Sequence, residues 1–218
     1  MKVEKKDQTF PKKILFVDFN GVISYNTFWD SIRNQTHPLN SYYDSIEDFL
    51  FVGETKITGL VDDWMRGKYT SEQIHQLIAA KTGAPYQSLF DLFCTDCQKI
   101  DISFPILNNV QTLRKKWYCI LRTDNMDSLR RLTIPANPVL TQSFDEIQCS
   151  YEIGTLKKDN NGEYFLTTIA NLGSSIENST IIDDSQTTCE LFESLGGKSY
   201  CTRNETEALF VLNTLMRQ

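Results

Sequence analysis

The chain has 218 residues, a net charge of −6 and 40% hydrophobic residues, which fits one soluble globular domain or a core with a modest insertion. The acidic balance argues against a nucleic-acid-binding protein, and no apolar run reaches the length that crosses a membrane. We therefore expect neither nucleic-acid nor membrane partners. We also predict a cytoplasmic protein, because the sequence shows no signal-peptide pattern and its cysteines lie in apolar segments.

The first predicted element is a strand over Ile14–Phe19, whose unbroken run of apolar residues indicates burial on both faces. Its carboxyl end carries Asp18, and the following Asn20 and Gly21 allow a sharp turn. A carboxylate there is costly to bury, and ligands of open α/β sheets bind at this end of the strands. Asp18 is therefore a candidate nucleophile or metal ligand; the alternative is a residue that only forms the turn.

The segment 25–103 shows no convincing strand pattern and carries amphipathic helical patterns instead. One of these follows a capping box over Thr70–Gln73, and another opens at Pro85. We expect this segment to form an all-helical cap domain, inserted into a core made of residues 1–24 and 104–218.

Beyond the segment 25–103, strand and helix patterns alternate. The predicted strands are Trp117–Leu121, Glu146–Ser150, Thr180–Ile182 and Lys198–Cys201. Helical stripes lie at Ile106–Leu113, Tyr164–Leu172, Cys189–Leu195 and Ala208–Leu215. This alternation predicts an α/β fold with a doubly wound parallel sheet of the Rossmann-like type, in which the first strand lies centrally between the strands at 119–121 and 180–182.

Polar side chains follow the predicted strands at the points where the strands end. They are Thr123, Asp124 and Asn125 after the second strand, Lys157 and Lys158 beyond the third, and Asp183 and Asp184 after the fourth. Because parallel strands end at one edge of a sheet, these groups should meet Asp18 there. Simpler interpretations are a helix N-cap for Thr123, a surface position for the lysine and a solvated strand end for the acidic pair.

Four motifs in this order resemble those of the haloacid dehalogenase-like (HAD) hydrolase superfamily. The motifs are Asp18-Phe19-Asn20-Gly21-Val22, Thr123, Gly154-Thr155-Leu156-Lys157 and Asp183-Asp184. The resemblance implies an Asp18 nucleophile that forms an aspartyl-phosphate, with a small phosphorylated molecule as substrate. Lys157 is preferred over Lys158 because its spacing from Gly154 matches the family motif.

The same resemblance implies a Mg²⁺ site and a phosphate site. The metal ligands would be Asp18, the backbone carbonyl of Asn20 and Asp183, while Asp184 belongs to the acidic metal motif and orients water or the lysine. The phosphate would be bound by Thr123, Asp124 with neighbouring amides, and Lys157.

Asn20 departs from the family pattern, in which an Asp at this position donates and accepts the catalytic proton. An amide has no titratable proton, so acid–base catalysis at Asn20 is lost while its backbone carbonyl remains. Three interpretations follow: a slow phosphatase, a reaction that needs no acid here, or a phosphate-ligand binding protein without turnover. The acidic pair Asp183-Asp184 argues against a dehalogenase. A phosphonatase would need a cap lysine, for which the candidates are Lys56, Lys68 and Lys81.

Two further features have a structural and a functional interpretation. Cys94 and Cys97 form an isolated C-x-x-C pattern that we interpret as structural, since no further zinc ligands have suitable spacing. The aromatic residues of the predicted cap either pack its core, which we favour for most of them, or line a ligand site. They are Phe28, Trp29, Tyr42, Tyr43, Phe49, Phe51 and Trp64.

Overall fold

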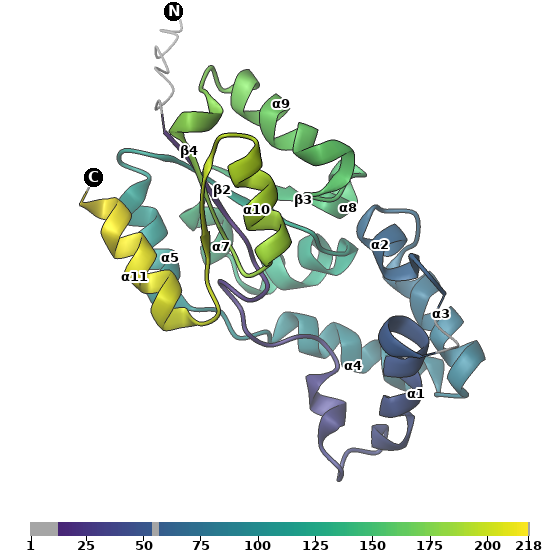
Figure 1. Cartoon of the computed structure of the whole chain (residues 1–218). Coiled ribbons are helices and arrows are strands. Elements are labelled where there is room, and N and C mark those ends of the chain that lie inside the picture. Colours follow the sequence, from purple (N-terminus) through teal and green to yellow (C-terminus); the bar gives the residue numbers. More distant parts are fainter. Residues whose placement is uncertain (1–12, 54–56, 218) are drawn as a thin grey trace, which may run out of the picture.

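The computed structural model describes residues 13–53 and 57–217 and contains one five-stranded parallel sheet (Figure 1). Its strands are β1 (Ile14–Val17), β2 (Tyr118–Thr123), β3 (Glu146–Cys149), β4 (Ser179–Asp183) and β5 (Lys198–Cys201). The order is β3-β2-β1-β4-β5, so β1 is central and is flanked by β2 and β4, as predicted. The register pairs Phe16 with Ile120 on one side and with Ile181 on the other, which aligns the carboxyl ends of the three strands.

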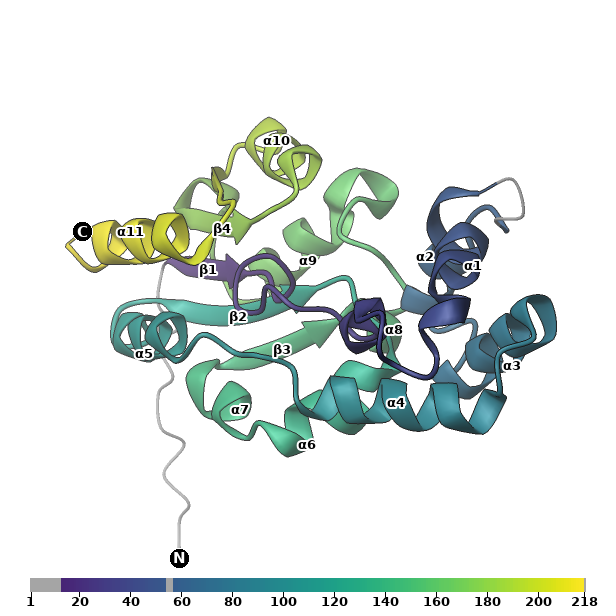
Figure 2. The same cartoon turned by 90° about the horizontal axis from the view of Figure 1, so that it is seen from below.

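Helices cover both faces of the sheet (Figure 2). One face packs on α5 (Phe104–Leu113), α7 (Val139–Ser143) and α11 (Glu205–Met216), and the other on α9 (Glu163–Asn171) and α10 (Gln186–Ser194). The four residues of β1 are fully buried, which explains their unbroken apolar run. The predicted fold class, an α/β Rossmann-like core with a parallel sheet, is confirmed.

Shorter elements connect these layers and are part of the same body. They are η4 (Leu129–Thr133), α6 (Ile134–Ala136), α8 (Ser150–Ile153), η5 (Asp159–Gly162) and η6 (Ile176–Asn178).

Between β1 and β2, the described residues form helices and no strand. The elements of this helical block are η1 (Asp30–Arg33), η2 (Asn40–Tyr42), α1 (Tyr43–Glu47), η3 (Asp48–Val52), α2 (Leu60–Met65), α3 (Ser71–Thr82) and α4 (Tyr86–Gln98). The predicted capping box at the start of α3 is present, because Thr70 and Gln73 bond each other's backbone N–H groups. Pro85 is the N-cap of α4, one residue outside the helix that it was predicted to open.

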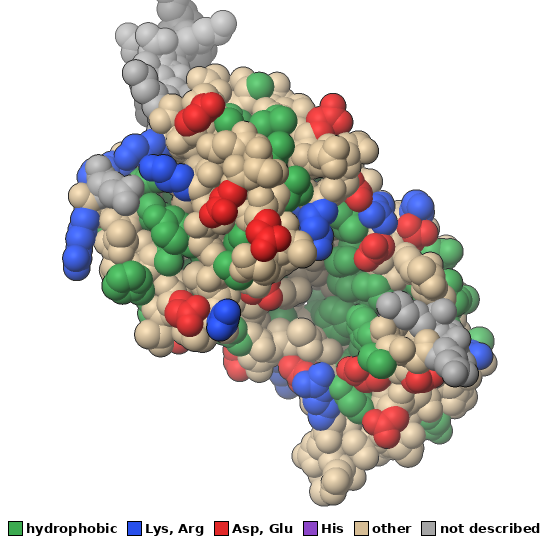
Figure 3. Space-filling model, in the orientation of Figure 1, with side chains coloured by type: hydrophobic (Ala, Val, Ile, Leu, Met, Phe, Trp, Pro, Cys, Tyr) green, Lys and Arg blue, Asp and Glu red, His purple; other side chains and the backbone are tan. Residues whose placement is uncertain are grey.

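The helical block has its own hydrophobic cluster and is bonded to the sheet body at several points, the first of which is Asp127. The buried Asp127, which lies just after β2, accepts hydrogen bonds from Ser71 N (3.2 Å) and Trp64 Nε1 (3.2 Å). The second point is a bidentate ion pair in which Arg66 Nε and Nη2 lie 2.8 and 2.7 Å from the carboxylate of Asp159. The surface is hollowed between the block and the sheet body, and hydrophobic side chains gather there (Figure 3).

The sequence predicted no membrane-spanning segment and cysteines that are structural. Over residues 13–53 and 57–217, we find no helix with the length and apolar character needed to cross a membrane. All six cysteines are free, and burial raises the pKa of the Cys97 thiol to about 12, which keeps it in the unreactive thiol form.

Candidate active site

The carboxyl ends of the central strands bring together three of the predicted side chains. The Lys157 ammonium lies 2.7 Å from Asp18 Oδ2 and 2.6 Å from Asp183 Oδ2, and all three residues are buried. Lys158 points elsewhere, since its Nζ donates to the exposed Thr187 Oγ1. The geometry therefore places Lys157, and not its neighbour, beside the candidate nucleophile.

Backbone groups fix the two carboxylates in this cluster. Asp18 Oδ1 accepts from Phe19 N at 2.7 Å, and Asp183 Oδ1 accepts from Ser185 N at 2.9 Å. The turn after β1 needs a glycine at position 21, where φ is +74° and an added Cβ would lie 2.3 Å from Asp184 Oδ2. Gly21 thus lets the acidic pair approach the first strand closely.

Burial dominates the electrostatics of the cluster. It raises the pKa of Asp18 to about 7, with the nearby Asp183 adding to the rise and the Lys157 ammonium opposing it. Burial alone would lower the pKa of Lys157, but the carboxylates of Asp18, Asp183 and Asp124 raise it above its ordinary value. Lys157 is therefore cationic at neutral pH and holds the carboxylates together.

Thr123 is the last residue of β2 and Asp124 follows it, and the two side chains are placed differently. Thr123 Oγ1 is buried and has no hydrogen-bond partner within the described residues, which makes it free to bond a ligand oxygen. The carboxylate of Asp124 instead accepts from Lys157 N at 2.9 and 3.1 Å, and burial raises its pKa. Asp124 thus shapes the loop that carries Lys157.

Arg122 is a site residue that sequence reasoning missed. Its side chain is 1% exposed, lies 3.6 Å from Asp124 Oδ1 and donates to Thr155 O at 3.2 Å. A cation–π contact with Tyr164 completes its surroundings. The signal was available, because a charged residue directly after the buried run Cys119-Ile120-Leu121 is expensive to bury unless it is paired.

Three carboxylates form a set that could hold a metal ion. Oxygen atoms of Asp18, Asp183 and Asp184 lie within 4.8 Å of one another. Carboxylate oxygens are the donors that Mg²⁺ prefers, and the all-oxygen set contains no thiolate or imidazole that would favour zinc. The three carboxylates therefore fit the predicted magnesium ion.

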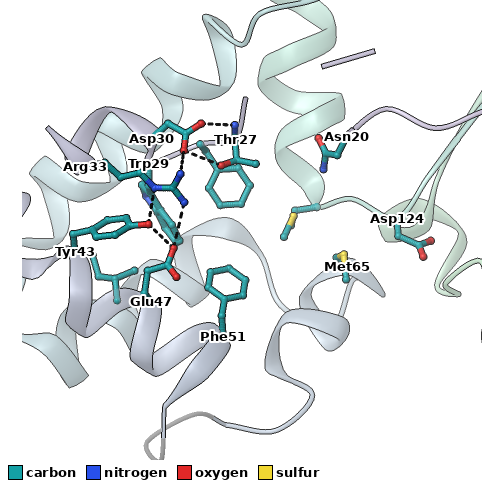
Figure 4. Close-up of a pocket in the computed structure, with 13 residues that line it drawn as sticks. Asn20, Thr27, Trp29, Asp30, Arg33, Tyr43, Glu47, Phe51, Met65 and Asp124 are labelled. Carbon is teal, nitrogen blue, oxygen red and sulfur yellow. Dashed lines mark hydrogen bonds and ion pairs between the residues drawn. The ribbon is translucent and has the colours of Figure 1, made fainter. Parts of the chain in front are cut away.

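A cavity of about 320 Å³ opens beside this cluster (Figure 4). Asn20, Asp124 and Met126 contribute to its wall from the sheet body. The helical block supplies the rest: Thr27, Phe28, Trp29, Asp30, Arg33, Tyr43, Ile46, Glu47, Phe51 and Met65. The sequence did not identify Asp30, Arg33 and Glu47, because they lie in short helices whose arrangement no periodicity predicts.

The aromatic residues singled out in the sequence divide into two groups. Tyr42, Phe49 and Trp64 pack in the cluster of the helical block without lining the cavity. Phe28, Trp29 and Tyr43 belong to or pack against that cluster and also line the cavity, as does Phe51. Trp29 has a φ of 67°, an unfavourable backbone conformation for a bulky residue. Its backbone N–H donates to Asp96 Oδ2 at 2.9 Å.

Of the candidate cap lysines, the two that the structure describes, Lys68 and Lys81, do not line this cavity. Lys68 is exposed and pairs with Asp63 at 2.9 Å, and Lys81 is exposed beside a different hollow. Lys56 lies outside the described residues.

Comparison with solved structures identifies proteins of the same fold. A predicted HAD-like family hydrolase from Porphyromonas gingivalis is 22% identical, with a TM-score of 0.74 over 94% of this chain and 98% of that one. A HAD family enzyme from Bacteroides thetaiotaomicron, solved with magnesium and inorganic phosphate, is 20% identical, with a TM-score of 0.67 over 86% and 92%. The L-2-haloacid dehalogenase of Xanthobacter autotrophicus, solved with covalently bound chloropropionic acid, is 12% identical, with a TM-score of 0.58 over 86% and 76%.

No family model and no curated protein sequence matches this chain. The chain nevertheless has the fold of HAD-like hydrolases, and the resemblance inferred from four short motifs is confirmed at the level of the fold.

Proposed function

We propose that this protein is a Mg²⁺-dependent phosphohydrolase of low turnover, which acts through an aspartyl-phosphate at Asp18 on a small phosphorylated molecule. The observation that carries the proposal is the buried pair of contacts from Lys157 to Asp18 and Asp183. A lysine held between two carboxylates at the ligand-binding edge of a parallel sheet is suited to bind a phosphoryl group next to a nucleophile. The magnesium and phosphate in the Bacteroides structure of the same fold support this chemistry.

In the proposed reaction, a carboxylate oxygen of Asp18 forms a bond to phosphorus while the bond from phosphorus to the ester oxygen breaks. Lys157 balances the negative charge on the transferred group, and the unpartnered Thr123 hydroxyl donates to one of its oxygens. A bound Mg²⁺ ion, held by Asp18, Asp183, Asp184 and the Asn20 carbonyl, would lessen the repulsion between the two anions. Water then hydrolyses the aspartyl-phosphate and regenerates the carboxylate.

Asn20 is the reason that we expect a low rate of hydrolysis. Because its amide cannot protonate the leaving oxygen, the alcohol must leave with a proton from water or as a stabilised anion. The second candidate function, a phosphate-ligand binding or regulatory protein without turnover, is favoured by this same residue.

The proposal assigns residues 25–103 as a cap that closes over a core of residues 1–24 and 104–218. Its support is the separate hydrophobic cluster of the helical block and the cavity shared by the two parts. The cap supplies the wall that surrounds the leaving group.

The test is phosphate release from para-nitrophenyl phosphate with Mg²⁺, compared between wild type and Asp18→Asn. We expect slow, EDTA-sensitive turnover that the substitution abolishes, and acid-quenched enzyme should carry a phosphoryl group on the peptide containing Asp18. Binding of phosphate without turnover would establish the second candidate function, and turnover that survives Asp18→Asn would overturn the assignment of the nucleophile.

A further inference from the structure

The cavity beside Asp18 has a polar end in the helical block, opposite Asn20 and Asp124 (Figure 4). At this end Tyr43 donates to Glu47 Oε1 at 2.6 Å, and Arg33 Nε lies 2.6 Å from the Tyr43 hydroxyl. Arg33 also pairs with Asp30 Oδ1 at 3.2 Å and with Glu47 Oε1 at 3.7 Å. The single guanidinium of the cavity wall therefore has three partners at this end, although its side chain is 59% exposed.

The charge at this end is negative. Asp30 and Glu47 face one arginine, and Asp124 is the remaining charged residue of the cavity wall. Asp30 is already bonded to Thr27 N at 2.8 Å, whereas Glu47 uses only its Oε1 in the contacts described. Glu47 thus retains an acceptor atom and a charge that a cationic group of a ligand could meet.

The middle of the cavity is apolar and aromatic. Phe28 and Trp29 pack edge to face with centroids 5.0 Å apart, and Phe51 and Met65 lie across from them on the wall. A cavity of about 320 Å³ has room for one substituted ring. Such a wall favours a planar apolar body over a sugar, whose hydroxyls would find few partners there.

Asn20 also favours an aromatic leaving group. Without an acid at this position, a phenolate leaves more readily than an alkoxide, because it needs less protonation in the transition state. The chemistry at one end of the cavity and the aromatic wall in its middle therefore select the same kind of molecule.

We infer that the cavity selects aryl phosphate monoesters that carry a cationic group on the ring, opposite the phosphate, and disfavours those that carry a carboxylate. This inference rests on the proposed function for the place of the phosphate. The ring lies between Phe28, Trp29 and Phe51. The cation lies at Glu47, at the end of the cavity opposite the one where Lys157 balances the phosphate charge.

The test uses benzylphosphonates, in which a methylene group replaces the ester oxygen so that binding is measured without turnover. Titration calorimetry with Mg²⁺ compares 4-aminomethyl-, 4-methyl- and 4-carboxymethyl-benzylphosphonate. Glu47 and Asp30 are part-exposed, so the expected effect is modest: about threefold tighter binding for the amine and about threefold weaker for the acid, relative to the methyl compound.

Glu47→Gln should lower the preference for the amine over the acid severalfold while leaving the methyl compound unaffected, because the amide still accepts from Tyr43. Asp44→Asn is the matched control: Asp44 is an exposed acid on the same helix α1 that does not line this cavity, and its loss should leave the preference unchanged. Equal or tighter binding of the acid, or a preference that survives Glu47→Gln, would overturn the inference. Turnover of phenyl phosphate, measured separately, reports on the proposed hydrolase function itself.

Discussion

Restoring an acid at position 20 is the sharpest perturbation of the proposed chemistry. Asn20 is half-buried, follows Asp18 by two residues and lines the cavity, so Asn20→Asp exchanges an amide for a carboxyl group of nearly the same size. The neighbouring carboxylates of Asp18, Asp183 and Asp184 disfavour a further negative charge and therefore raise the pKa of the new group. A raised pKa keeps the group partly protonated near neutral pH, as a general acid requires.

The expected gain follows from this single proton transfer. General acid–base catalysis contributes about 10²–10⁴-fold, which corresponds to a barrier lower by about 3–5 kcal/mol. The gain should be largest for an alkyl phosphate such as glycerol 2-phosphate, whose leaving alkoxide needs the proton. Para-nitrophenyl phosphate should gain less, because only water attack on the aspartyl-phosphate benefits.

The assay measures kcat and kcat/KM for both esters in wild type, Asn20→Asp and Asn20→Ala, because faster water attack on the aspartyl-phosphate appears only in kcat. Intact-mass analysis accompanies it, because an Asn-Gly sequence is prone to deamidation. Combining Asn20→Asp with Asp18→Asn should abolish both activities. If Asn20→Asp binds Mg²⁺ and phosphate yet gains nothing on the alkyl ester, the hydrolase proposal is refuted and the binding function replaces it.

Three further predictions concern stability. Asp127→Ala leaves Ser71 N and Trp64 Nε1 without their acceptor. The free energy of unfolding, measured by denaturant titration, should therefore fall by about 2–4 kcal/mol. An unchanged midpoint would show that this contact does not hold the helical block. Burial lowers the pKa of His75 to about 4, so between pH 6.5 and 4 the unfolded chain binds a proton that the folded chain does not. The free energy of unfolding should therefore drop by about 3 kcal/mol as pH falls through this range. His75→Leu should remove that part of the pH dependence, and an unchanged dependence in the variant would contradict the assignment. Burial raises the pKa of Asp18 to about 7, so as pH rises from about 4 to 7 the unfolded chain loses its proton first and the wild type loses stability. In EDTA at about pH 8, Asp18→Asn should therefore melt at a higher temperature than wild type. An equal or lower melting temperature would contradict the cost assigned to this charge.

The parts of the fold that the sequence predicted are those with strong local signals. The buried run Ile14–Val17, the capping box at Thr70 and the strand–helix alternation after residue 103 each depend on neighbouring residues, and each has its counterpart in the structure. The motif spacing also predicted Lys157 as the lysine beside Asp18, and the two side chains are in contact in the structure. They meet because parallel strands bring their carboxyl ends to one edge of the sheet.

The rest depends on contacts between residues far apart in the chain. Tyr43 and Glu47 are neighbours on one turn of α1, but Arg33 reaches them only because η1 and α1 fold against each other, which nothing in the sequence spacing indicates. The carboxylate of Asp124 looked like a phosphate-site group, but its bond to Lys157 N depends on where the loop after β3 returns to the sheet. Such roles become visible only in three dimensions.

The buried cluster is better explained by ligand binding than by stability. Taking Asp18, Asp183 and Lys157 out of water costs free energy that their mutual attraction only partly offsets, and apolar side chains at the same places would stabilise a fold at least as well. Asp184 adds a fourth charge nearby, and its pKa is raised by burial and by Asp183. A chain that lacks the acid at Asn20 but carries all these charges has a site suited to binding a metal and a phosphoryl group. Hydrolysis and binding can therefore be tested separately at this site: Asn20→Asp tests hydrolysis, and titration with phosphate and Mg²⁺ tests binding.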